Sequence, residues 1–240
     1  MIIVVDCPQD VSKFVGYIKS ETSHAVNILL GRRQRTVWQE GYDSPPLLTP
    51  KDVLYYIRYI YLNPTRAGLV PDISEYPGVS SWEMFCSGRH TVKHKRAERM
   101  HLFKLPTPAL GVNEQKRIVA VLSEKPGSVN EFELQPFAWV DSFPQLEGID
   151  LEDLKQQLLQ DIAREHRELR DERIKSKRRF IGATDLRRQS MLMDWEPKKF
   201  SKKMICICSD RALRLLFLET FKALAEQARI VYQKLSLIHI

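Results

Sequence analysis

Four tyrosines stand in the stretch "LYYIRYIYLNPTR", residues 54–66, just before an Asn-Pro pair. Tyrosine can serve as a core side chain or as a nucleophile, so the face of a helix on which each one lies matters. With about 100° between successive residues, the apolar stripe facing a core would consist of Val53, Tyr56, Ile57 and Ile60. A second line on the flank of that stripe, in steps of four residues, would consist of Tyr55, Tyr59 and Asn63.

A phenol that attacks a phosphodiester needs a rigid mount, a metal or other cation to stabilise developing negative charge, and a polar neighbour. Tyr59 would have the helix as its mount and Asn63 as a neighbour one turn away. Pro64 disfavours helical geometry at the residue before it, so we expect the helix to end at Asn63. Arg66 follows closely and would place a guanidinium near a bound phosphate. Spacing alone favours a structural role for Tyr59 over that of a nucleophile.

The elements that must position this helix can be predicted in outline. Thr49 is expected to cap it, with Pro50 at the first helical position and Asp52 in the first turn. Upstream, "MIIVV" is typical of a buried strand, and a helix is expected over residues 10–30. The apolar face of that upstream helix would consist of Val11, Phe14, Val15 and Ile18. "RTVWQEGYDSPPLL" is expected to form strand and turn, and "YPGVSSWEMF" a loop anchored by aromatic side chains.

The second half of the chain is expected to be mainly helical. Residues 100–143 are typical of strand, helix and strand, in the segments "HLFKL", "NEQKRIVAVLSE" and "EFELQPFAW". "FPQLEG" marks a boundary near residue 147. A long helix over residues 150–177 would follow, with acidic residues at its start and basic ones at its end, as its dipole prefers. Its apolar face would consist of Leu151, Leu154, Leu158 and Ile162. A last helix is expected from Ser209 to about Lys234.

The charge is uneven, and its distribution favours a polyanionic partner. The chain carries a net charge of +7 with a pI near 9.2. Residues 164–203 hold 14 lysines and arginines against 7 acidic residues, a balance of +7, so the rest is neutral in sum. A solvated helix face is the alternative explanation, but this one-sided concentration favours nucleic acid. The candidate DNA contacts are Arg58, Arg66, Lys175, Lys177, Arg178, Arg179, Lys198, Lys199, Lys202 and Lys203, with Lys51 beside them.

Composition also excludes some classes of protein. No apolar run approaches the roughly 18–20 residues that cross a bilayer, so no membrane partner is expected. "MIIVV" is too short for a signal peptide and lacks a basic start. The four cysteines have neither metal-site nor disulfide-framework spacing, which favours idle or buried thiols in a cytoplasmic protein. They are Cys7, Cys86, Cys206 and Cys208.

"YIRYIYLNPTRAGLV" followed by "YPGVSSWEMF" resembles the signature of the single-tyrosine HUH transposases. The branch it is most similar to is that of the REP-associated tyrosine transposases, whose usual pattern is RYIxLNPVRAGLV and then YPWSS. "GRRQRTVWQEGYDS" is similar to the segment that joins the two helices in that family. The resemblance covers about residues 1–90.

The resemblance implies a fold, a reaction and a set of partners. The fold would be α+β, with a partial ferredoxin-like (HUH-type) sheet, its helices, and a helical basic C-terminal region. Tyr59 would be the nucleophile that attacks single-stranded DNA beside a hairpin and forms a 5′-phosphotyrosyl link. Asn63 would help to build the site of Mg²⁺ or Mn²⁺, the implied cofactor. Single-stranded or hairpin DNA is the implied partner, and a homodimer is compatible with the family.

The chain departs from the family pattern at the metal site. Relatives carry a His-hydrophobe-His motif on a central strand, and this sequence has no such motif. "MIIVVDCP" resembles the same strand entered just after the second histidine, so we expect an N-terminally truncated copy. The apolar ending "KLSLIHI" suggests that the C-terminal end is artificial as well. His90 and His94 are spaced to share a metal on a helix, but "GRHTVKHKR" is expected to be a loop, so no metal site is predicted in this chain, apart from Asn63 as a partner ligand.

Three hypotheses follow for the function. In the first, the chain is a DNA-cleaving and rejoining transposase or a fragment of one. In the second, it is a non-catalytic nucleic-acid-binding remnant whose binding does not depend on Tyr59. In the third, it is a protein-interaction domain that uses the helices near 150–177 and 209–234. The expected organisation is a catalytic-type domain over residues 1–90, an α+β extension over 91–147, and a helical basic region over 148–240. Salt-sensitive DNA binding separates the first two hypotheses from the third.

Overall fold

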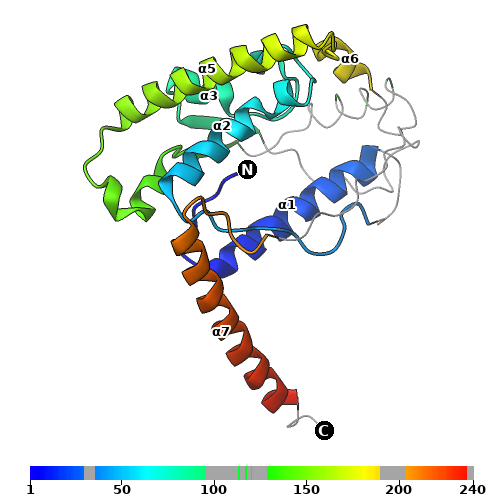
Figure 1. Ribbon diagram of the computed structural model, residues 1–240. Coiled ribbons are helices and arrows are strands. Elements are labelled where there is room, and N and C mark those ends of the chain that lie inside the picture. The colour runs from blue at the N-terminus through cyan, green and yellow to red at the C-terminus, as the bar shows by residue number, and fades with distance from the viewer. Residues whose placement is uncertain are drawn as a thin grey trace.

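The computed structural model describes residues 1–29, 36–95, 129–189 and 204–236, with three further helical positions at 113, 117 and 120. Over these ranges the chain forms six α-helices with defined bounds and one two-stranded antiparallel sheet, so the expected α+β class is confirmed (Figure 1). The sheet pairs β1 (Thr91–Lys95) with β2 (Val129–Glu133). Its register places Thr91 opposite Glu133 and Lys95 opposite Val129.

The tyrosine helix is α2 (Pro50–Arg66), and it begins as predicted. The Thr49 side chain accepts a hydrogen bond from the Asp52 backbone N–H at 3.2 Å, which caps the first turn. The predicted end at Asn63 is wrong, because the helix continues through Pro64 to Arg66. Pro64 and its neighbour in the last turn, Thr65, are buried, so packing outweighs the local cost of a proline within a helix.

The long helix α5 (Leu151–Lys175) lies along α2, and the contact between them forms the centre of the molecule (Figure 1). Asp150 caps α5, and acidic residues open it while basic residues close it, as predicted. Three of the four residues expected on its apolar face are buried, whereas Leu151 is 45% exposed. The main core cluster consists of Leu62, Ile73, Phe85, Leu158 and Ile162. A neighbouring cluster consists of Val53, Trp139, Val140 and Leu154.

The face of α2 that meets this core is rotated from the predicted stripe. Val53 is buried and Ile57 packs against both clusters, as expected. Leu62, which was not in the predicted stripe, is fully buried, while Tyr56 and Ile60 stay half-buried. The rotation has a physical cause, because α5 and the 3₁₀ helix η1 (Ile73–Glu75) cover the flank on which Leu62 lies.

The N-terminal segments differ from their predictions. Residues 1–5 do not form a strand and are largely exposed, so the expected buried strand at "MIIVV" is wrong. The helix α1 (Pro8–Leu29) is present as expected, but only Asn27 and Ile28 are buried on it, and Phe14 of its predicted apolar face is exposed. Residues 36–48 contain no strand, only an isolated bridge between Leu47 and Ile207.

Several later segments also take a different form from the expected one. Part of the expected loop "YPGVSSWEMF" is the helix α3 (Trp82–Ser87), which Gly88 ends in a left-handed conformation with φ +66°. "GRHTVKHKR" contributes β1 instead of a loop. The expected strand at "EFELQPFAW" starts earlier, as β2, and gives way to the 3₁₀ helix η3 (Ala138–Ser142). The segment "HLFKL" lies outside the described residues, and the helix predicted after it is described at positions 113, 117 and 120 alone.

The expected boundary near residue 147 coincides with a short 3₁₀ helix, η4 (Pro144–Leu146), and with Gly148 at φ +76°. Because α5 follows this point and packs on α2, the core joins residues on both sides of it. The division into three regions stays a prediction. The short helix α6 (Ala183–Arg188) follows α5, and α7 (Arg211–Ser236) confirms the predicted last helix. In Figure 1 α7 projects away from the other helices, and among the described helices none is long and apolar enough to cross a membrane.

Candidate functional site

Two of the four tyrosines on α2 are exposed, and they are the two predicted on its flank. The Tyr55 side chain is 47% exposed and that of Tyr59 is 38% exposed, and Asn63, one turn further, is also exposed. The Tyr55 and Tyr59 rings are nearly parallel, with centroids 6.5 Å apart and 22° between their planes. The line predicted from four-residue spacing is therefore confirmed as an accessible face of the helix.

The other two tyrosines are less suited to act as nucleophiles. Tyr61 packs against Trp82 and Phe85, with ring centroids 5.1 and 5.4 Å away, and its hydroxyl lies 3.1 Å from the Ser81 hydroxyl. Burial raises the pKa of the Tyr61 phenol. Burial also raises the pKa of Tyr56, and negative charge on the neighbouring tyrosines or on Asp52 would raise it further. Because the phenolate is the stronger nucleophile, both shifts disfavour attack by these two side chains.

The predicted phosphate-binding arginines of α2 lie beside Tyr59, but carboxylates of α5 engage them. The Arg66 guanidinium carbon lies 5.4 Å from the centroid of the Tyr59 ring, and Arg66 also forms an ion pair with Glu165. Arg58 pairs with Asp161 at 3.1 Å and with Glu165 at 3.7 Å. All four side chains are partly exposed, so each pair contributes at most about 1 kcal/mol to stability.

The two carboxylates were missed from the sequence, although a signal for them exists. Asp161 and Glu165 are four residues apart, so they lie on the same face of α5, one turn from each other. Arg58 and Arg66 are eight residues apart on α2, or about two turns. Two helices with matching acidic and basic faces favour side-by-side packing, but the sequence does not show which pair of helices will meet.

The basic residues that close α5 are brought to the C-terminal end of α2. Lys175 is the last residue of α5, and the exposed residues Lys177, Arg178 and Arg179 follow it directly. The chain then turns back, because the Ile181 N–H donates to the Gly68 carbonyl at 3.0 Å and the Gly182 N–H donates to the Leu69 carbonyl at 2.8 Å.

Arg173 supports the same turn from within α5. Its guanidinium donates to the Arg179 carbonyl at 2.9 and 3.2 Å and lies 4.9 Å from the centroid of the Phe180 ring. The structure therefore brings four of the predicted DNA contacts, residues 175 and 177–179, near the end of the tyrosine helix. The remaining four lie outside the described residues: Lys198, Lys199, Lys202 and Lys203.

The residues near Tyr59 do not match the donor set of a divalent cation. The described part of the chain has no group of three or more His, Cys, Asp or Glu side chains placed to hold a metal ion. Asn63 offers a neutral amide oxygen one turn from Tyr59. His90 precedes β1 and His94 lies within it, so the four-residue spacing that would suit a metal on a helix falls on an extended segment. The four cysteines are free.

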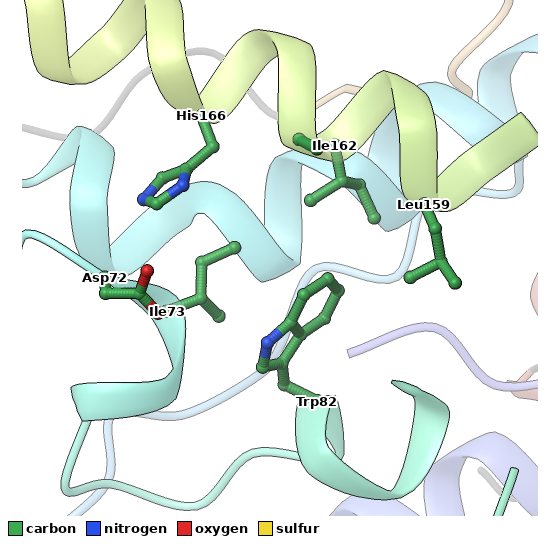
Figure 2. A pocket seen from close by; sticks show the side chains of 7 residues that line it. Asp72, Ile73, Trp82, Leu159, Ile162 and His166 are labelled. Carbon is green, nitrogen blue, oxygen red and sulfur yellow. The ribbon is translucent and has the colours of Figure 1, made fainter. Parts of the chain in front are cut away.

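A cavity of about 250 Å³ lies elsewhere, between η1, α3 and α5 (Figure 2). The Asp72 carboxylate and the His166 ring point into the same space, above the Trp82 indole. Hydrogen bonds from the Ser74 hydroxyl and backbone N–H lower the pKa of Asp72, and the charges of His166 and Arg170 lower it as well. The residues that line the cavity are Asp72, Ile73, Trp82, Leu159, Ile162, Ala163 and His166. No residue predicted for the site is among them.

No protein-family model, no curated protein and no solved structure matches the chain. The geometry of α2 and α5 is therefore what indicates a function. That geometry combines an accessible phenol on a well-packed helix, a guanidinium beside its ring, an amide one turn away, and a basic segment at the end of the helix. Such a set of groups is suited to hold a phosphodiester near the phenol.

Proposed function

We propose that the chain is a DNA transposase of the single-tyrosine type, or a fragment of one, which cleaves and rejoins single-stranded DNA. The observation that carries the proposal is the position of Tyr59. Its phenol is accessible on a helix fixed by the core, with the Arg66 guanidinium 5.4 Å from its ring and Asn63 one turn further. The resemblance of residues 54–85 to the transposase signature supports the same assignment.

The proposed reaction is a transesterification at phosphorus. The Tyr59 oxygen forms a bond to the phosphorus of the scissile phosphate, while the bond from that phosphorus to the 3′ oxygen breaks. The phenol proton leaves to solvent, and the departing 3′ oxygen takes up a proton, which gives a 3′ hydroxyl and a 5′-phosphotyrosyl link. In the rejoining step a 3′ hydroxyl attacks the same phosphorus and the phenol leaves. The number of phosphodiester bonds is unchanged, so no external energy source is needed.

The residues of this chain would contribute orientation and charge. The Arg66 guanidinium lies over the Tyr59 ring, and a phosphate could compete with Glu165 for it because this ion pair is partly exposed. The basic segment 175–179 would contact the backbone of the strand, which supplies affinity without sequence choice. Asn63 would orient the phosphate or contribute an oxygen to a Mg²⁺ or Mn²⁺ ion, although the described residues do not complete such a site.

The fold that goes with this proposal is a partial ferredoxin-like sheet of the HUH type, although the two strands of the described residues, β1 and β2, both lie beyond residue 90. The mixed helix and strand content supports the α+β part of that description. The HUH-type arrangement itself rests on the resemblance of residues 1–90.

The proposal is tested by trapping the covalent link. The protein is incubated with an end-labelled single-stranded hairpin oligonucleotide and Mn²⁺ or Mg²⁺, and the products are separated on a denaturing gel. We expect a protein–DNA adduct that is absent from Tyr59→Phe and retained in Tyr55→Phe, the matched neighbour on the same face. An adduct that persists in Tyr59→Phe would contradict the assignment of the nucleophile.

A second candidate, non-catalytic binding of nucleic acid, is favoured by the ion pairs of Arg58 and Arg66. Asp161 and Glu165 offset both guanidiniums next to Tyr59, where a cleaving enzyme would need free positive charge for the transition state. This candidate predicts salt-dependent binding of DNA that is equal in the unmodified protein and in Tyr59→Phe, without any adduct. The same gel, run beside a native gel, separates the two functions.

A further inference from the structure

We infer that the exposed side chains of Tyr55 and Tyr59 form a stacking platform for the bases of single-stranded DNA. This inference rests on the proposed function, since it assigns a role to the surface around the proposed nucleophile. It gives Tyr55 a part in binding that depends on its ring and not on its hydroxyl.

The two rings have the geometry of a platform and not of a core. Both are exposed in the middle of a helix, and their planes are within 22° of each other. Tyr61, on the same helix, shows what core packing looks like, because it is partly buried against the main core cluster and its hydroxyl lies 3.1 Å from the Ser81 hydroxyl. Tyr56 meets Tyr55 edge-on, with centroids 5.3 Å apart and 78° between the planes, and so buttresses the first ring.

The basic segment 175–179 near the C-terminal end of α2 favours nucleic acid as the occupant of the platform. α2 carries three cations, and its one carboxylate, Asp52, is buried and accepts hydrogen bonds from the Ser209 backbone N–H at 3.0 and 3.1 Å. The hydrogen bond from Ile181 to Gly68 brings the exposed basic segment 175–179 near the C-terminal end of α2, about two turns beyond Tyr59. Aromatic faces for bases next to cations for phosphates are the combination that binds single strands.

The same charges indicate how the binding energy divides between bases and backbone. Because Asp161 and Glu165 offset Arg58 and Arg66, the surface immediately around the two rings has little free positive charge. Binding at the rings should therefore come mainly from stacking, and contact with phosphates mainly from residues 175–179. Removing the Tyr55 ring should weaken base binding while leaving the salt dependence of affinity nearly unchanged.

The test is a metal-free equilibrium titration, in which no cleavage is required. Fluorescence anisotropy measures the affinity for a labelled oligothymidylate and for a strand of equal length whose central nucleotides are abasic. The abasic strand keeps the phosphates and lacks the bases. The variants are Tyr55→Leu, which removes the ring, and Tyr55→Phe, which keeps it. The control is Tyr232→Leu on α7, where the tyrosine is 77% exposed.

We expect the unmodified protein to bind the abasic strand at least about fivefold more weakly than the oligothymidylate, since one stacked base contributes roughly 1–3 kcal/mol. Tyr55→Leu should lose a similar factor on the oligothymidylate and nothing on the abasic strand. Tyr55→Phe and Tyr232→Leu should bind like the unmodified protein. Equal affinity for the two strands, or an unchanged affinity in Tyr55→Leu with its helical circular dichroism intact, would overturn the inference.

Failure of the platform and failure of the proposed function are distinguishable. Tyr59→Phe keeps a ring on the platform and removes the nucleophile, so it should bind the oligothymidylate normally while forming no adduct. Binding that depends on bases in a protein without any adduct would support the platform and contradict the cleavage reaction. The comparison of the two strands on the unmodified protein needs no variant, so equal affinities would overturn the inference even if Tyr55→Leu does not fold.

Discussion

The helices α2 and α7 have similar apolar periodicity, but the molecule uses them differently. The apolar residues of α2 pack against α5, η1 and α3, and Leu62 has no exposed surface. On α7 the large apolar side chains stay accessible, with Leu216 at 60% exposure. Periodicity in a sequence therefore predicts that a helix forms, whereas burial depends on the partner that another part of the chain supplies.

This difference has a consequence for function. Because α2 is fixed on one face by the core, the side chains on its other face have defined positions, which a catalytic group requires. This arrangement fixes the stretch of helix that carries Tyr55, Tyr59 and Asn63. No residue of α7 has a comparable support among the described residues, and α7 projects from the body of the molecule (Figure 1).

The largest expected effect on the free energy of unfolding comes from a substitution in the contact between α2 and α5. Leu62→Ala should lower the free energy of unfolding by about 2–5 kcal/mol, because it opens a cavity between α2 and α5. Leu216→Ala on α7 should change it by less than about 0.5 kcal/mol. Urea unfolding followed by circular dichroism measures both. Equal losses in the two variants would show that α7 is as firmly packed as α2.

Alanine substitutions at two glycines should change the free energy of unfolding by a smaller amount, and with opposite signs. Gly68 has φ +75°, and a Cβ there would meet the Arg173 guanidinium, so Gly68→Ala should lower the free energy of unfolding by about 1–2 kcal/mol. Gly16 lies within α1 with no atom within 4 Å of an added Cβ, so Gly16→Ala should raise it by about 0.5–1 kcal/mol. The same urea series tests both signs, and a loss at Gly16 would contradict the open environment of α1.

The smallest expected effect is the contribution of Asp72, in the cavity beside α5, to the pH dependence of stability. The pKa of Asp72 is lowered by its hydrogen bonds with Ser74 and by nearby positive charge, so its ionised form stabilises the folded state. That stability is fully present above the ordinary carboxyl pKa of about 4 and is lost as the pH falls through the lower folded value. Unfolding midpoints measured from pH 6 down to pH 3 should fall less steeply in Asp72→Asn. Identical slopes would show that Asp72 does not contribute to the acid dependence.

Local signals in the sequence predicted the starts of the long helices α2 and α5. Thr49, Pro50 and Asp52 mark the start of α2 through capping chemistry that needs no tertiary contact. For α5 the signals were the acidic residues at its start, the basic residues at its end and the spacing of Leu154, Leu158 and Ile162. The accessible line of Tyr55, Tyr59 and Asn63 followed from helical geometry alone.

The failures came where partners far along the chain decide the outcome. "MIIVV" has the composition of a buried strand, yet no strand lies beside it among the described residues, and the segment stays exposed. The end of α2 was misplaced because the burial of Pro64 outweighs a local preference. The ion pairs of Arg58 and Arg66 join residues about 100 positions apart, which no local pattern reveals.

The most direct test of the central claim identifies the residue that carries the DNA. After reaction with a single-stranded hairpin oligonucleotide and Mn²⁺, the protein is digested with nuclease and protease, and the nucleotide-linked peptide is sequenced by mass spectrometry. We predict a nucleotide joined through its 5′ phosphate to Tyr59. A link at Tyr55, Tyr56 or Tyr61, or no linked peptide while DNA binding persists, would contradict the assignment of Tyr59 as the nucleophile of a transposase.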